Sequence, residues 1–310
     1  MRRNLVLMAL AAAALSMTAC DFENFVDSDR YKEDFNFSYD LKPGGTVSVE
    51  SMNGSIEIAG WEKNAVQITG TKYAASQDLL SALKVDIMNS PDSVRVRVVK
   101  PSERRGGMGA RFVLRVPTKV LLDRITTSNG GIRVEGVEGQ SRLRTSNGSV
   151  KVWKMMGPLE ASTSNASIEV QEFNGSAVLN TSNGHIKADG VRGRFEADTS
   201  NASIDARLSA LEEGRPIKAD TSNGSINLTV AELKGNDIIA STSNSSITVR
   251  LPPAVAAQLN ATTSNSSITS DFEITVQGTQ NKNRLQGNIG GGGPKIELTT
   301  SNGSIRVLKL

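Results

Sequence analysis

Residues 221–226 read Thr-Ser-Asn-Gly-Ser-Ile, and this hexapeptide or a near copy of it recurs along the chain. The threonine of each copy lies at Thr127, Thr145, Thr163, Thr181, Thr199, Thr221, Thr242, Thr263 and Thr300. The first four steps between them are 18 residues, the next three are 22, 21 and 21, and the last is 37. A fixed period of this length is typical of stacked repeats. Repetition of one polar corner favours a scaffold or a binding surface, because catalysis needs one unique constellation of residues.

Apolar residues alternate with polar ones on both sides of each corner. They stand two residues before the threonine, as at Leu179, and three and five residues after the asparagine, as at Ile186 and Ala188. A period of two predicts two short strands per repeat, joined at the corner. The glycine or small residue after the asparagine suits a backbone with positive φ.

Two arrangements of these strands compete. Asn-Gly between strands is a strong hairpin signal, so a meander of hairpins is one of them. A meander would not need the same residues at every corner, whereas parallel coils stacked in register place like residues above one another. The sequence therefore favours an all-β fold: a single-stranded parallel β-solenoid with two short strands per repeat, preceded by an irregular β-rich section that contains one short helix. The last step of 37 residues, with Gly287 and 290–293, is expected to be a loop or excursion from the rod.

In this solenoid the asparagines form a structural ladder. A middle member such as Asn183 is expected to be buried, with its amide paired to Asn165 and Asn201. The predicted ladder comprises Asn129, Asn147, Asn165, Asn183, Asn201, Asn223, Asn244, Asn265 and Asn302.

The first residues are typical of a targeting segment rather than of a folded domain. Arg2 and Arg3 precede an apolar stretch, and the segment ends Met17-Thr18-Ala19-Cys20. This ending resembles a bacterial lipobox, so we expect residues 1–19 to be a lipoprotein signal peptide and Cys20 to be the site of lipid attachment (acyl chains such as palmitate). A plain secretory signal cleaved nearby is the competing interpretation. The expected organisation continues with a tether at 20–42, a β-rich cap region at 43–120 and the repeat solenoid at 121–310.

Charge and cysteine content restrict the partners. Removal of Arg2 and Arg3 from the 35 basic residues leaves 33 against 32 acidic ones, so no nucleic-acid partner is expected. The chain has one cysteine, so no internal disulfide can form. The expected partners are a membrane, through the lipid, and an envelope polymer or protein of unknown identity. The sequence does not decide between the inner and the outer membrane.

The order of motifs resembles a known family. A strand, Pro43-Gly44-Gly45, a first Asn-Gly-Ser-Ile copy at 53–56, Gly60-Trp61, a short helix near 76–84 and a Val-Pro element precede the repeats. From about residue 40 onward the chain resembles the DUF4097 family of bacterial envelope proteins, described as proposed adhesins with a β-solenoid repeat. The resemblance implies an envelope location and a β-solenoid fold, and it transfers no catalytic residues.

Few residues are candidates for chemistry, and no catalytic residue, cofactor site or metal site is predicted. His185, the only histidine, replaces the serine of the repeat at a surface corner, where a solvated substitution is the simpler interpretation. Pairs of Cys or His with metal-ligand spacing are missing. The predicted function is a non-enzymatic cell-envelope lipoprotein that acts as an adhesin, surface-binding protein or structural scaffold.

Two other function classes compete with this prediction. One is a polysaccharide-active enzyme on a β-helix, which would need clustered carboxylates, with Asp189, Asp198, Asp205 and Asp220 as candidates. In the stacked arrangement Asp198 and Asp220 become neighbours, and like charges there could raise one pKa. The other is an ice- or crystal-binding array, which the burial phase of the threonines argues against. Trp61 and Trp153 are the only large aromatic platforms for a sugar.

Overall fold

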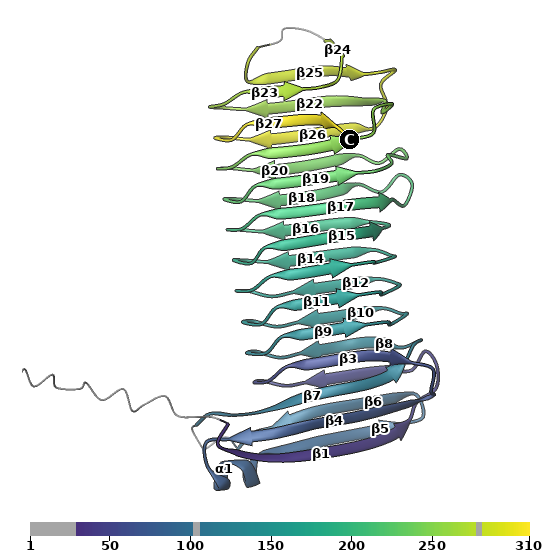
Figure 1. The fold of residues 1–310 in the computed structure, drawn as a ribbon, viewed down its shortest axis with the longest axis vertical. Coiled ribbons are helices and arrows are strands. Elements are labelled where there is room, and N and C mark those ends of the chain that lie inside the picture. Colours follow the sequence, from purple (N-terminus) through teal and green to yellow (C-terminus); the bar gives the residue numbers. More distant parts are fainter. Residues whose placement is uncertain (1–28, 102–105, 277–280) are drawn as a thin grey trace, which may run out of the picture.

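A computed structural model describes residues 29–101, 106–276 and 281–310 of the chain. Two long β-sheets lie face to face and run along a rod, with the N-terminal strands at one end, here called the base (Figure 1). Among the described residues, one sheet has 13 strands and the other has 14. We call them sheet A and sheet B.

Sheet A carries the repeat strands that follow the asparagine corners, together with three strands of the base, β1, β4 and β7. Its strands, in spatial order, are β1 (Tyr31–Asp40), β4 (Ala65–Ala74), β7 (Met108–Pro117), β3 (Ile56–Trp61), β9 (Ile132–Glu135), β11 (Val150–Trp153), β13 (Ile168–Gln171), β15 (Ile186–Arg192), β17 (Ile204–Ala210), β19 (Ile226–Val230), β21 (Ile247–Leu251), β27 (Ile305–Lys309) and β23 (Ile268–Ser270).

Sheet B carries the repeat strands that precede the corners, together with β5 and β6 at the base and β24 and β25 at the far end. Starting from the base, its strands are β5 (Lys84–Ser90), β6 (Ser93–Val99), β2 (Thr46–Glu50), β8 (Leu121–Thr126), β10 (Ser141–Arg144), β12 (Leu159–Ser162), β14 (Ala177–Thr181), β16 (Phe195–Thr199), β18 (Ile217–Thr221), β20 (Ile238–Thr242), β26 (Lys295–Thr300), β22 (Ala257–Thr263), β25 (Arg284–Ile289) and β24 (Ile274–Val276).

Each repeat contributes one strand to each sheet, and neighbouring repeats pair in parallel. Ile168, for example, pairs with Val150 on one side and Ile186 on the other. These inward side chains are fully buried, and one apolar core runs from Leu41 at the base to Val307 near the far end. Alternation of inward apolar and outward polar residues buries one face of each sheet against the other. The parallel β-solenoid predicted from the repeat is therefore confirmed.

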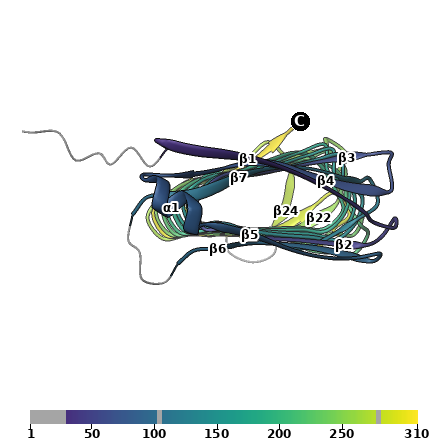
Figure 2. The same cartoon turned by 90° about the horizontal axis from the view of Figure 1, so that it is seen from below.

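The base closes the rod with strands of longer and partly antiparallel pairing. β1 and β4 pair antiparallel, as do β4 and β7, and β5 pairs antiparallel with β6. The helix α1 (Gln77–Ala82) lies at one side between the two sheets (Figure 2), and it buries Leu79 and Leu80. Ser76 caps this helix by accepting a hydrogen bond from the Leu79 backbone N–H at 3.3 Å. Residues 31–40 form a strand, so a tether reaching to residue 42 was too long; Phe35 packs on Phe112 and anchors that strand.

The far end of the rod departs from sequence order. β26 lies between β20 and β22, and β27 lies between β21 and β23, so the last repeat is inserted between the two repeats that precede it (Figure 1). The 37-residue step is not the loose excursion expected from its glycines. Its residues include β24 and β25, which extend sheet B by antiparallel pairing beyond β22. The chain therefore passes through β24 and β25 at the far end first, and then continues into β26 and β27, which lie nearer the base.

Candidate functional site

An asparagine ladder follows the corner of the rod. Each side-chain Nδ2 donates a hydrogen bond to the Oδ1 of the asparagine one coil nearer the base, at 2.6–2.9 Å. All nine bonds run in the same direction along the rod. In spatial order the ladder consists of Asn53, Asn129, Asn147, Asn165, Asn183, Asn201, Asn223, Asn244, Asn302 and Asn265.

The ladder differs from the expectation in burial and in length. Asn183 donates to Asn165 and accepts from Asn201, but its side chain is exposed, whereas burial was expected. The backbone explains this, because the corner carbonyls face the next coil (Asn183 N–H to Ser164 O, 2.9 Å) and the side chain projects outward. Asn53 extends the ladder and was missed, although the degenerate copy at 51–58 carried the signal.

A second set of hydrogen bonds lies inside the same corner. Each repeat threonine is nearly buried, and its Oγ1 donates to a backbone carbonyl of the coil below at 2.9–3.1 Å. Thr181, for example, bonds to the carbonyl of Ala166. Threonine is therefore required as an interior link between coils. Its burial also leaves no exposed threonine rank of the kind an ice-binding surface would need.

The four candidate carboxylates do not form one cluster. Asp189 and Asp205 lie on sheet A, and Asp198 and Asp220 lie on sheet B. Asp198 and Asp220 are register neighbours, as expected. Burial raises the pKa of the Asp220 carboxyl above its ordinary value and the charge of Asp198 raises it further, while Lys218 lowers it. The four carboxylates are therefore divided into two pairs on different sheets and do not converge on one site.

His185 is not an isolated solvated side chain. Its Nδ1 lies 2.7 Å from Ser203 Oγ, and its Nε2 lies 3.3 Å from Asp205 Oδ2. Asn227 Nδ2 donates to the other oxygen of Asp205 at 2.6 Å. Sequence reasoning missed this group, because the partners come from two further coils and no local motif joins them.

The outer face of sheet A is hollowed in several places. A hollow of about 620 Å³ lies over β15, β17, β19 and β21 and includes His185 and Asp205. A smaller one of about 180 Å³ is lined by Trp153 and Arg133, and Arg133 also lines a third of about 250 Å³ over β3, β7 and β9. The Trp153 ring is partly exposed, with its Nε1 held by Glu172 at 3.0 Å. One face of the rod therefore offers a series of hollows with an aromatic platform.

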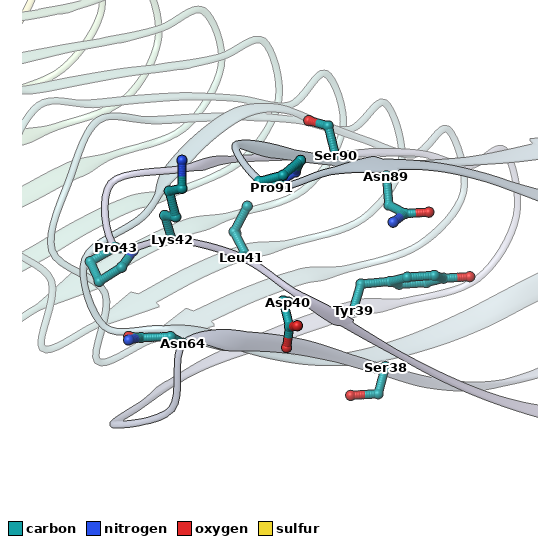
Figure 3. A pocket seen from close by; sticks show the side chains of 10 residues that line it. All are labelled: Ser38, Tyr39, Asp40, Leu41, Lys42, Pro43, Asn64, Asn89, Ser90 and Pro91. Atoms are coloured by element: carbon teal, nitrogen blue, oxygen red, sulfur yellow. The ribbon is translucent and has the colours of Figure 1, made fainter.

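A further hollow of about 810 Å³ opens at the base (Figure 3). Its lining comes from the end of β1 and the turn after it, and from the end of β5 on the opposite sheet. Lys42 and Asp92 form an exposed ion pair beside it at 3.3 Å. No converging set of charged or nucleophilic groups distinguishes it among the described residues.

Among the residues that the structure describes, no three His, Cys, Asp or Glu side chains are grouped so as to hold a metal ion. Within residues 29–101, 106–276 and 281–310, no helix combines the length and apolar character needed to span a membrane. Cys20, the predicted site of lipid attachment, lies outside the described residues.

Comparison with known proteins assigns the family. The family model described as Toastrack DUF4097 matches residues 118–308, which is more than half of the chain and includes every full copy of the repeat. The chain belongs to the Toastrack DUF4097 family. No curated protein is similar enough to count as a match for this Toastrack chain.

Three solved structures are similar to the Toastrack chain at low identity. A proposed adhesin from Parabacteroides merdae has 11% identity and a TM-score of 0.36, covering 90% of this chain and 96% of its own. A proposed lipid-binding protein from Parabacteroides distasonis has 12% identity and a TM-score of 0.28, with 91% and 98% covered. A proposed adhesin from Bacteroides fragilis has 11% identity and a TM-score of 0.27, with 90% and 97% covered.

Proposed function

We propose that this Toastrack protein is a non-enzymatic lipoprotein of the bacterial cell envelope. In this proposal, lipid at Cys20 anchors it to a membrane, and the outer face of sheet A binds an envelope polymer or protein as an adhesin or scaffold. The observation that carries the proposal is the series of hollows on that face, in which Arg133 joins two and Trp153 supplies an aromatic platform. Repeated coils supply such a surface at a regular spacing of about 4.8 Å.

The proposed anchor restricts where the base lies. Cys20 precedes the first described residue, Asp29, by nine residues, and nine extended residues reach at most roughly 32 Å. In this proposal the base stays near the membrane that holds the lipid. The stacked coils then extend away from the base along the rod (Figure 1). Lipid chains supply firm anchoring, since each buried methylene contributes about 0.8 kcal/mol.

Two measurements test the proposal separately. Intact mass of membrane-extracted protein should show loss of residues 1–19 and added acyl mass, and Cys20→Ser should release the protein from membranes. Identical fractionation and mass for Cys20→Ser and the unchanged chain would contradict the anchor.

Binding is tested by co-sedimentation of the protein with purified envelope material. Trp153→Ala should weaken co-sedimentation, while Arg144→Ala, an exposed change on sheet B, should leave it unchanged. Equal binding by the two variants would contradict a role for the sheet A face.

A further inference from the structure

One coil corner carries an imidazole where other coils carry serine. His185 is the only histidine of the chain, and the same position holds Ser167 one coil below, Ser203 one coil above and Ser225 two coils above. The ring is directed at Ser203, with 2.7 Å between Nδ1 and Oγ. Ser203 is thus the one corner serine with an imidazole nitrogen within hydrogen-bond distance among the described residues.

The neighbouring carboxylate favours one tautomer of the neutral ring. Asp205 as a carboxylate can only accept, so the ring nitrogen facing it, Nε2, is the one that carries hydrogen. Nδ1 then holds a lone pair and accepts from the Ser203 hydroxyl. Asp205 is itself held, because Asn227 donates to its second oxygen at 2.6 Å.

These contacts form a serine, an imidazole and a carboxylate in the order that activates a hydroxyl. Activation requires a base in hydrogen-bond contact with the nucleophile and a third group that orients the base. The group is recognised by geometry and roles rather than by position in the sequence, and here two adjacent coils supply it. His185 and Asp205 line the surface hollow of about 620 Å³, with the cationic Arg250 and Lys187 along the same hollow. Ser203 itself is half-buried, with its Oγ 2.7 Å from the His185 ring, so a ligand bound in the hollow lies against the base that contacts Ser203.

We propose that Ser203 is an activated nucleophile that forms an ester with acyl groups presented on the outer face of sheet A, with His185 as general base and Asp205 as the residue that positions the ring. Ser203 Oγ attacks the carbonyl carbon of an ester, and its proton passes to Nδ1 of His185. The bond from that carbon to the leaving oxygen breaks, and the leaving oxygen takes the proton from the ring. One ester and one alcohol result, and no oxidant or other co-reactant is needed.

This site goes beyond the proposed function without depending on it. A scaffold binds through surface hollows whether or not Ser203 reacts, whereas the reaction would fix a bound molecule covalently to one coil. Stoichiometric acylation is compatible with a non-enzymatic protein.

The test uses p-nitrophenyl acetate as acyl donor on the full chain. After reaction, trypsin separates residues 195–207, which contain Ser203, from residues 219–234, which contain the half-buried control Ser225. Acetylation of Ser203 should exceed that of Ser225 by about 10²-fold, the contribution of a positioned general base. The rate should fall on acidification, because a protonated ring cannot accept the hydroxyl proton.

The matched variant is His185→Ser, which restores the residue that other coils carry and so preserves the repeat. It should reduce Ser203 acetylation to the Ser225 level with an unchanged melting temperature, and Asp205→Asn should lower the rate while retaining the pH dependence. Equal labelling of Ser203 and Ser225, no labelling, or labelling that survives His185→Ser would overturn the proposal. Nitrophenolate release that continues past one equivalent and requires Ser203 would support the nucleophile and refute the non-enzymatic assignment instead.

Discussion

The backbone of the neighbouring coil limits the size of the residue that follows a ladder asparagine. A Cβ built on Gly184 would lie 1.7 Å from the carbonyl oxygen of Ala166, and the same conflict arises at Gly130, Gly148, Gly224 and Gly303. None of these five glycines has the positive φ that the sequence suggested. Close approach of the neighbouring backbone is therefore the reason for glycine there.

Gly184→Ala should destabilise the protein by about 1–3 kcal/mol, because the new methyl group forces the two coils apart. The measurement is the free energy of unfolding in urea. Ala202→Gly, at the same position one coil above, is the control, and it should cost no more than about 1 kcal/mol since it only adds backbone freedom. Equal losses for the two variants would mean that the contact with Ala166 is not limiting.

Asn183→Ala should cost about 1–2 kcal/mol, because it removes two neutral hydrogen bonds worth roughly 0.5–1.5 kcal/mol each. Exposure keeps the loss small, since water can satisfy Asn165 and Asn201. Asn180→Ala, an exposed asparagine on β14 with no side-chain hydrogen bond within the described residues, should leave the melting temperature unchanged. If Asn183→Ala and Asn180→Ala gave the same melting temperature, the asparagine ladder would not contribute to stability.

Two carboxyls on sheet B should give opposite pH effects. The pKa of Asp220 is raised, chiefly by burial, so its charged form opposes folding once the pH exceeds that pKa. Asp220→Asn should therefore raise the melting temperature at pH 7, and the gain should vanish in acid below the ordinary carboxyl pKa, where the carboxyl is protonated in both the folded and the unfolded state.

The hydrogen bond from Arg194 lowers the pKa of Glu196, so Glu196→Gln should lower the melting temperature at pH 7, with the difference lost as the pH falls through that lowered pKa. Melting curves of both variants from pH 3 to 7 check this, and shifts of the same sign at pH 7 would contradict it.

At the scale of elements, the inserted C-terminal repeat can be tested by disulfide trapping. Ser241, Thr299 and Thr262 point outward at equivalent positions of β20, β26 and β22, in that spatial order. Parallel neighbours lie about 4.8 Å apart, within the Cα separation of about 4.4–6.8 Å that a disulfide spans, while strands two apart lie beyond it. In a Cys20→Ser background, the pair Ser241→Cys with Thr299→Cys should therefore oxidise to a disulfide. The pair Ser241→Cys with Thr262→Cys should stay reduced, and the reverse result would restore sequence-order stacking.

Sequence reasoning predicts these coils because every repeat encodes them locally, through alternating apolar residues and the asparagine corner. It missed the insertion, since nothing local ties residues 295–309 to one neighbour rather than another. One signal was present. At the position after the ladder asparagine, a coil with a side chain is followed by a coil with glycine, as Gly184 lies over Ala166 and Gly224 over Ala202. Ser245 therefore requires glycine in the coil above it, and only the inserted order supplies one, because it places Gly303 between Ser245 and Ser266. The His185 group stayed hidden for the same reason, because its partners meet only once the coils are stacked.

At the scale of the molecule, base and rod share one core. β2 and β3 stack directly on β8 and β9, with Ile56 opposite Ile132, so the first coil of the solenoid precedes residue 120 in the sequence. The strands of residues 65–117 pack below that coil as the base. Without them, β2 and β3 would present unpaired edges, which favour association with other chains. The boundary at residue 120 remains a prediction about which parts unfold together.

The two tryptophans report on these parts separately. Trp61 ends β3 beside the base, with its Nε1 donating to the Ala65 carbonyl at 2.8 Å, and Trp153 ends β11 within the repeats. Because the apolar core and the parallel ladders continue across β3 and β9, disrupting one part exposes strand edges of the other, so the two should unfold together. Trp153→Phe and Trp61→Phe leave one reporter each, and their fluorescence in urea should give the same midpoint, matching circular dichroism of the unchanged chain. A Trp61 transition that precedes or follows the Trp153 transition, with circular dichroism showing both steps, would instead make residues 43–120 a separate folding unit, since repeat arrays lose cooperativity where one interface is weak.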